Sequence, residues 1–244
     1  NSVLNGLEGQ TETFEPTTTQ ALSTTFHPTT QASTTMPSPV AHYKLDEGSG
    51  TTALDSSGNG YNGTLTNGPI YTSNQNGIYG NVLSLDKSSN NYISLSTIPT
   101  SIFEGTSSFT ISLWFNLSQI SNTTGTNSRG ALFTTYSSSN GFTIWANDYL
   151  NSGNRMSIEV YNRQDGNYIL QTDENTITLN NWIHLVYSHT STEQKVYLNG
   201  QLSKTATSSA INFSTTMANP VVGAESPGYY YFDGKISDVR IYDT

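Results

Sequence analysis

The sequence predicts an all-β domain, a two-sheet antiparallel sandwich, preceded by an extended threonine-rich N-terminal tail. Three observations predict it. Many short segments alternate apolar and polar residues, Gly, Asn and Asp separate these segments at short intervals, and no window shows a helical period. The 244 residues suffice for one large domain. We therefore expect the tail at residues 1–39 and the sandwich at residues 40–244.

The tail is rich in threonine, serine and proline. Residues 11–39 contain 11 Thr, 3 Ser and 4 Pro but no Lys or Arg, with a quasi-repeat at residues 16–26 and 28–36. Such a segment cannot bury a core and is typical of a stalk or linker, often O-glycosylated when secreted. The alternative is an assembly segment, ordered by packing against a neighbouring subunit. The candidate O-glycosylation sites are Thr17, Thr18, Thr19, Thr24, Thr25, Thr29, Thr30, Thr34 and Thr35.

The clearest strand is FTISLWFNL at Phe109–Leu117, because its apolar residues alternate strictly and lie on one face. Further strands are predicted at residues 40–45, 81–85, 91–95, 131–136, 141–146, 155–161, 167–172, 182–190, 195–200 and 235–242. Asn199–Gly200 is a strong hairpin signal, since both residues tolerate a positive φ.

Charge and composition exclude several classes of partner and site. The chain has 9 Lys plus Arg against 18 Asp plus Glu, a net charge of −9, without a basic run. This charge set argues against nucleic acid and anionic membrane surfaces as partners, because both need clustered Lys and Arg. The absence of cysteine excludes disulfides, thiol catalysis and thiolate zinc sites. No apolar run reaches the roughly 18 residues of a membrane helix, so no membrane insertion is expected. Because the chain does not begin with Met, we expect a processed N-terminus that has lost a targeting signal.

Three blocks carry a resemblance to a known family. Residues 40–65 read VAHYKLDEGSGTTALDSSGNGYNGTL and resemble the opening of laminin-G-like, concanavalin A-like jelly-roll domains. Residues 180–205 (NNWIHLVYSHTSTEQKVYLNGQLSKT) and 231–243 (YFDGKISDVRIYD) are similar to the central strand pair and the closing strand of that family. The resemblance implies a jelly roll and a secreted or cell-surface protein, because most members are extracellular recognition or adhesion modules. Fold alone does not assign function, and some relatives in the wider superfamily are glucanases.

The residues argue against an enzyme. Glycoside hydrolysis needs two carboxylates that flank the bond, and no predicted strand carries acids at positions i and i+2. Glu159 stands alone in its strand, and the GxSxG nucleophile elbow is absent. His184 and His189 are five residues apart in one strand, so they point to opposite faces and cannot bind one metal together. We expect no enzymatic activity.

The glycine-rich stretch at residues 48–60 looks like several ligand-binding loops. GSGTTA is not followed by a helix, which excludes a dinucleotide fingerprint and with it an organic cofactor. DSSGNG begins like an EF-hand loop, but its twelfth position is Thr66, and an EF-hand is excluded. The family resemblance implies one structural Ca²⁺ near the first and last strands, with Asp55, Asn59 and Asp238 as oxygen ligands. In the alternative reading, Asp55 and Asn59 only cap turns.

Aromatic residues and glycosylation sequons complete the candidate sites. Trp145, Tyr229 and Tyr231 are candidates for stacking on sugar rings, since Trp and Tyr combine an apolar plane with a polar tip; the alternative is that they are core residues. The N-x-[ST] sequons lie at Asn62, Asn116, Asn122 and Asn212.

Two functions follow from these patterns. The first is an extracellular, non-enzymatic structural or adhesion protein, displayed or self-assembled through its glycosylated tail into a fibre or array. The second is a carbohydrate-binding module with the tail as a passive linker to a larger secreted protein.

Overall fold

The computed structural model describes residues 37–73, 80–105, 107–119, 129–136, 140–147, 156–162, 166–207, 213, 217–225 and 229–243. All of them belong to a compact unit that runs from Pro37 to Thr244. The nine candidate O-glycosylation threonines, Asn122 and Asn212 lie outside the described residues.

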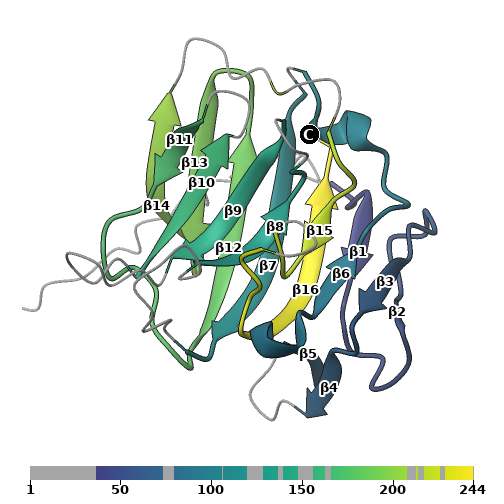
Figure 1. Cartoon of the computed structure of the whole chain (residues 1–244). Coiled ribbons are helices and arrows are strands. Elements are labelled where there is room, and N and C mark those ends of the chain that lie inside the picture. Colours follow the sequence, from purple (N-terminus) through teal and green to yellow (C-terminus); the bar gives the residue numbers. More distant parts are fainter. Residues whose placement is uncertain are drawn as a thin grey trace, which may run out of the picture. The chain divides into compact units, whose positions relative to one another are not determined.

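Two antiparallel sheets form the domain, and each has eight strands among the described residues (Figure 1). Sheet A has the order β14-β13-β12-β7-β16-β5-β4, with β1 also paired to β16. Its strands are β1 (Ala41–Tyr43), β4 (Ile70–Ser73), β5 (Asn81–Leu85), β7 (Phe109–Leu117), β12 (Trp182–His189), β13 (Glu193–Leu198), β14 (Gln201–Thr207) and β16 (Gly234–Tyr242).

Sheet B has the order β11-β10-β9-β8-β15-β6-β3-β2. Its strands are β2 (Thr52–Ala53), β3 (Gly63–Thr66), β6 (Tyr92–Ser94), β8 (Arg129–Thr134), β9 (Phe142–Asn147), β10 (Ser157–Asn162), β11 (Asn167–Gln171) and β15 (Val221–Val222). Two short 3₁₀ helices, η1 (Lys87–Ser89) and η2 (Thr100–Phe103), connect strands. The predicted two-sheet antiparallel sandwich is confirmed.

The core lies between the sheets and is built by alternation. The predicted apolar face of β7 is buried, with Phe109 in edge-to-face contact with Phe103 and stacked on Phe142 of sheet B. Each such side chain contributes about 1.5–3 kcal/mol when it is fully buried. The alternate residues of β7 and β12 consequently point to the outer face of sheet A.

The closing strand β16 changes its neighbour halfway along. One edge pairs with β7, whereas the other pairs first with β5 at Gly234–Ile236 and then with β1 at Val239–Ile241. Between the two halves a bulge places Asp238 at a φ of 53°. The carbonyl of Lys44 accepts hydrogen bonds from the backbone N–H of Asp238 and from Oγ of Ser237, both at 3.2 Å. The bulge returns Val239 to the core and places Arg240 on the outer face.

Candidate functional site

The glycine-rich stretch holds the first strand of the domain in place. Oδ1 of Asp55 accepts hydrogen bonds from the backbone N–H groups of His42 (3.0 Å) and Ser57 (2.9 Å), and Oδ2 accepts one from Tyr61 N–H (2.9 Å). Partial desolvation raises the pKa of Asp55, but the hydrogen bonds outweigh it and hold that pKa below its usual value.

The same stretch also binds the backbone of Val40. Nδ2 of Asn59 donates to the Val40 carbonyl at 2.8 Å. Oγ of Ser57 lies 3.0 Å from this carbonyl and 2.8 Å from Oδ2 of Asp55, and its single proton serves one of the two at a time. These contacts cap the loop and attach it to β1, so the geometry favours the turn-capping alternative.

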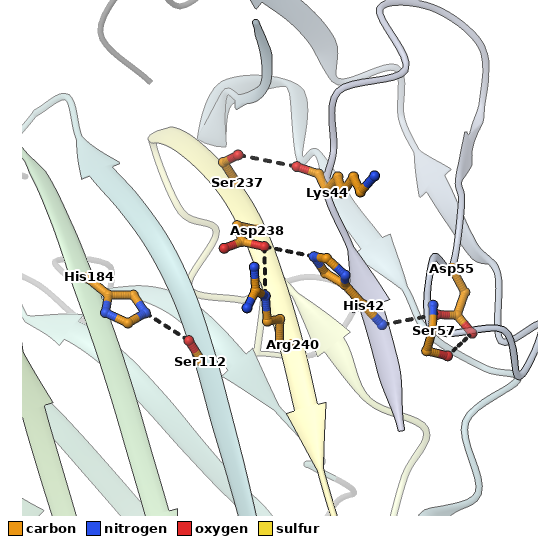
Figure 2. Close-up of polar contacts among 9 residues, drawn as sticks. All are labelled: His42, Lys44, Asp55, Ser57, Ser112, His184, Ser237, Asp238 and Arg240. Carbon is orange, nitrogen blue, oxygen red and sulfur yellow. Dashed lines mark hydrogen bonds and ion pairs between the residues drawn. The ribbon is translucent and has the colours of Figure 1, made fainter. Parts of the chain in front are cut away.

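Asp238 lies beneath the outer face of sheet A, with a side chain only 7% exposed. Its Oδ1 accepts hydrogen bonds from Nε2 of His42 at 2.8 Å and from Nε of Arg240 at 2.9 Å (Figure 2). His42 therefore carries a proton on Nε2. This group of three side chains joins β1 to β16.

Asp55 and Asp238 both contact His42, and Asn59 contacts the neighbouring Val40. In this arrangement, however, the predicted calcium ligands do not provide a set of free oxygen atoms for the ion. The backbone N–H of His42 binds Asp55 and its ring binds Asp238 (Figure 2). Calcium would have to displace these donors to obtain the six to eight oxygen ligands that it takes. No group of three or more His, Cys, Asp or Glu residues in the described part of the chain could hold a metal ion. The calcium site stays a prediction.

On the outer face of sheet A, side chains lie in rows that cross the strands. One row runs through His42, Arg240, Ser112, Val186 and Tyr197, which are successive partners on β1, β16, β7, β12 and β13. Five strands spaced 4.7–4.9 Å apart make this row about 19 Å wide. The surface is therefore wide enough for an extended ligand.

The next row of this surface is aromatic. Trp114 stacks on His184 with ring centroids 4.9 Å apart. Nε2 of His184 lies 2.8 Å from Oγ of Ser112, a contact that Figure 2 draws. Trp182 follows on the same face of β12. Desolvation lowers the pKa of His184, which the nearby Arg240 lowers further and Asp238 raises, so its ring is neutral at neutral pH. The sheet A face comprises His42, Ser112, Trp114, Trp182, His184, Tyr197, Asp238 and Arg240.

A second group of residues surrounds Trp145 on the outer face of sheet B. The indole Nε1 donates to Oε2 of Glu225 at 2.9 Å, and the Arg129 guanidinium lies 4.6 Å from the ring centroid. Nε of Arg129 is 3.3 Å from Oε2 of Glu159, whose Oε1 accepts a hydrogen bond from Gln171 at 2.9 Å. Glu159 and Glu225 are each only 2% exposed. We call Arg129, Trp145, Glu159 and Glu225 the Trp145 cluster.

The three predicted sugar-stacking residues have different surroundings. Trp145 is 1% exposed and offers no ring face to a ligand, whereas Tyr229 is 63% exposed. Tyr231 is half-buried, with its ring centroid 6.4 Å from that of Tyr92. The side chains around Trp145 cover its ring, so its role in stacking on a sugar stays a prediction.

The two described sequons also differ. Asn62 is exposed, and its Oδ1 accepts a hydrogen bond from the backbone N–H of Asp55 at 2.9 Å. Asn116 lies on the outer face of sheet A, opposite Trp182 on one side and Lys235 on the other. A glycan on Asn116 would therefore cover the surface beside Trp114.

The sequence reasoning did not identify the sheet A face as a site. The alternation that predicted the core could have identified this face. In FTISLWFNL the same alternation puts Ser112 and Trp114 on the face opposite the core, and in WIHLVYSHT it does so for Trp182 and His184. Trp114, Trp182 and His184 are half-buried on this face.

Comparisons with known proteins agree on the fold. A family model described as the concanavalin A-like lectin/glucanases superfamily matches residues 87–244. Domain 4 of AbnA, an extracellular arabinanase of Geobacillus stearothermophilus whose structure holds arabinotriose, is 22% identical, with a TM-score of 0.59 and coverage of 85% of this chain and 93% of that one.

Two toxin domains are similar in structure. The receptor binding domain of botulinum neurotoxin D is 17% identical with a TM-score of 0.61, over 85% of this chain and 49% of that one. The binding domain of Paraclostridial Mosquitocidal Protein 1 is 16% identical with a TM-score of 0.64, over 84% and 49%. The chain thus spans about half of each toxin domain. No curated protein matches the sequence. None of the helices in the described residues has the length and apolarity to cross a membrane.

Proposed function

The chain belongs to the concanavalin A-like lectin/glucanase superfamily, and on this basis we propose that its domain is a non-catalytic carbohydrate-binding module of an extracellular protein. The observation that carries the proposal is the sheet A face. It combines half-buried rings of Trp114, Trp182 and Tyr197 with the hydrogen-bonding groups of Ser112, His184 and Arg240.

Such a surface suits a sugar for a physical reason. Aromatic rings bind the apolar C–H faces of a pyranose or furanose, and fixed donors and acceptors bind its hydroxyl groups. His184 is held by Ser112 and Trp114, and Arg240 by Asp238, so little side-chain entropy is lost on binding. The face is consequently preorganised for a polar, ring-shaped ligand.

Structural neighbours support carbohydrate as the ligand class. One neighbour's structure contains arabinotriose, and the ligand binding domain of a botulinum neurotoxin serotype D, with 17% identity and a TM-score of 0.57, is in complex with N-acetylneuraminic acid. The two neighbours bind different sugars, and each resembles this chain in fold.

Two features support a non-catalytic role. A glycosidase needs two carboxylates about 5–10 Å apart beside an open bond position. Glu159 and Glu225 are buried and engaged by Gln171, Arg129 and Trp145, so neither carboxylate faces a substrate. Ser112, although it contacts His184, lies within β7 between two paired strands, where the backbone N–H groups belong to the sheet ladder and make no oxyanion hole.

The test is equilibrium binding of the full chain to neutral and acidic oligosaccharides, first on a glycan array and then by calorimetry. We expect Trp114→Ala and His184→Ala each to weaken binding roughly tenfold or more, about 1.4 kcal/mol. Leu54→Ala is the matched control, because this exposed side chain follows β2 at the far edge of sheet B. Unchanged affinity in both sheet A variants, with unchanged melting curves, would refute the site.

A further inference from the structure

A row of side chains crosses sheet A from β1 to the edge strand β14. Leu202 of β14 is the partner of Tyr197 and continues the row already described from β1 to β13. We call the set the cross-strand row: His42, Arg240, Ser112, Val186, Tyr197 and Leu202. Adjacent strands lie about 4.8 Å apart, so a row that crosses six strands is about 24 Å long.

A β-bulge brings Leu202 into the cross-strand row. The core-facing Val196 of β13 pairs with Lys204 of β14. The next residue, Tyr197, pairs with Leu202, whereas uninterrupted pairing would place Ser203 opposite it. Leu202 is 55% exposed and Tyr197 beside it is half-buried. The bulge therefore extends the outer face of sheet A with an apolar side chain that the core does not use.

The cross-strand row has an apolar half and a polar half. The apolar half lies on β12, β13 and β14 and consists of Val186, Tyr197 and Leu202. The polar half lies on β7, β16 and β1 and consists of Ser112, Arg240 and His42. Trp114 follows Ser112 on the same face of β7 and borders the junction of the two halves. Apolar C–H faces of sugar rings suit the first half, and sugar hydroxyl groups suit the second.

The shape of this surface suits the side of a sugar chain better than its end. Sites that enclose a small ligand are concave and bury most of it. The cross-strand row instead lies on six hydrogen-bonded strands of one sheet. A sugar ring is about as wide as one strand spacing, so a disaccharide covers only part of the row. Contact along the whole row requires several sugar units in line.

We propose that the sheet A face binds the interior of an extended polysaccharide chain, laid across the strands along the cross-strand row, with Tyr197 and Leu202 as its outer contacts. This inference deepens the proposed function and rests on it. The contacts are made to ring faces and hydroxyl groups along the chain, so the chain continues beyond the row at both ends. Each further sugar unit adds contact until the row is covered, and affinity rises with ligand length up to that point.

The experiment measures affinity against ligand length for the full chain. The probes are the di- to hexasaccharides of xylose, glucose, mannose, arabinose and galacturonic acid, each free and with its reducing end converted to the alditol. They are titrated by calorimetry into the parent, Trp114→Ala, Tyr197→Ala and Leu202→Ala. Leu54→Ala is the matched control, because it removes the same side chain, at 52% exposure, after β2 at the far edge of sheet B. Because Leu202 is exposed, its truncation leaves the core intact, and melting curves verify this.

We expect the affinity of the parent to rise roughly tenfold or more from the disaccharide to the hexasaccharide of the preferred sugar, and to be unchanged by reduction of the chain end. Tyr197→Ala and Leu202→Ala should each weaken hexasaccharide binding roughly two- to tenfold and leave disaccharide binding unchanged. Trp114→Ala should weaken binding at every length, and Leu54→Ala at none.

The other outcomes separate this inference from the proposed function. Equal affinity for the disaccharide and the hexasaccharide, or loss of binding on reduction of the chain end, overturns the extended site and leaves the proposed function standing. Hexasaccharide affinity that is unchanged in both Tyr197→Ala and Leu202→Ala overturns the placement along the cross-strand row. Binding of a glycan on the array but of none of these probes overturns the extended site alone. If the parent binds no glycan in either experiment, both proposals are wrong.

Discussion

His189 gives a quantitative prediction about stability and pH. The side chain is buried in β12, stacked on Phe109 with a centroid distance of 4.8 Å and packed against Phe213 at 4.7 Å. Its Nδ1 accepts a 3.4 Å contact from Nε2 of Gln194, which leaves the proton on Nε2. Burial lowers the pKa of His189 from 6.5 to about 4. The His189 ring is therefore neutral in the folded protein at neutral pH.

The sign and size of the change in the free energy of unfolding with pH follow from proton linkage. Between pH 6.5 and about 4 the unfolded chain holds a proton on this histidine and the folded chain does not. Unfolding therefore takes up a proton, and the free energy of unfolding falls as the pH falls. The gap between the two pKa values corresponds to about 3 kcal/mol, most of which is lost by pH 4.5.

The assay compares urea unfolding of the parent and His189→Phe by tryptophan fluorescence from pH 7.5 to 4.5. Subtracting the two curves cancels the titration of groups that both proteins share. Relative to the parent, the variant should gain about 2–3 kcal/mol over this range, whatever its stability at neutral pH. A difference that stays constant with pH, in this variant and in His189→Leu, would show that His189 titrates alike when folded and unfolded.

Three further predictions concern the start of the domain and the tail. Asp55→Asn should destabilise the domain by about 1.5–3 kcal/mol, because it removes a charged acceptor from three backbone donors. Urea unfolding measures this loss. The difference in stability should disappear as the pH falls below the usual carboxyl range, because Asp55 then becomes protonated. If the predicted calcium binds at Asp55, Asn59 and Asp238, millimolar calcium chloride should raise the melting temperature above that in EGTA, by an amount that grows with concentration; identical curves contradict it. If the tail assembles the protein, light scattering should find large species for the full chain and monomers for a chain starting at Val40, whereas monomers in both samples would identify the tail as a linker.

Local patterns predicted the central strands well. The strand predicted at Phe109–Leu117 is confirmed over its whole length, because alternation with a buried face is a local property of the chain. Asn199 and Gly200 adopt φ values of 50° and 79°, as the hairpin signal requires. The edge strand β14 was not predicted as a strand, since QLSKTAT buries no continuous face and, within the described residues, pairs with β13 alone.

The candidate sites depended on contacts between distant segments, which local patterns do not contain. Trp145 lies on the face of β9 opposite the core-facing Ile144, and Glu225 and Tyr230, about 80 residues later in the chain, contact its ring. The contact between His42 and Asp238 likewise spans 196 residues. Without the strand order, neither neighbourhood follows from the sequence.

One detail of the closing strand did carry a signal. In KISDVRIY the apolar residues Ile236, Val239 and Ile241 are spaced three and then two apart, whereas an uninterrupted strand requires a spacing of two throughout. The additional residue is the bulge at Ser237–Asp238, where β16 exchanges β5 for β1. Without it, strict alternation would turn Arg240 into the core and Val239 and Ile241 toward solvent. The bulge that allows β1 to join sheet A therefore also places Asp238 and Arg240 beside His42, so fold and candidate site share one structural cause.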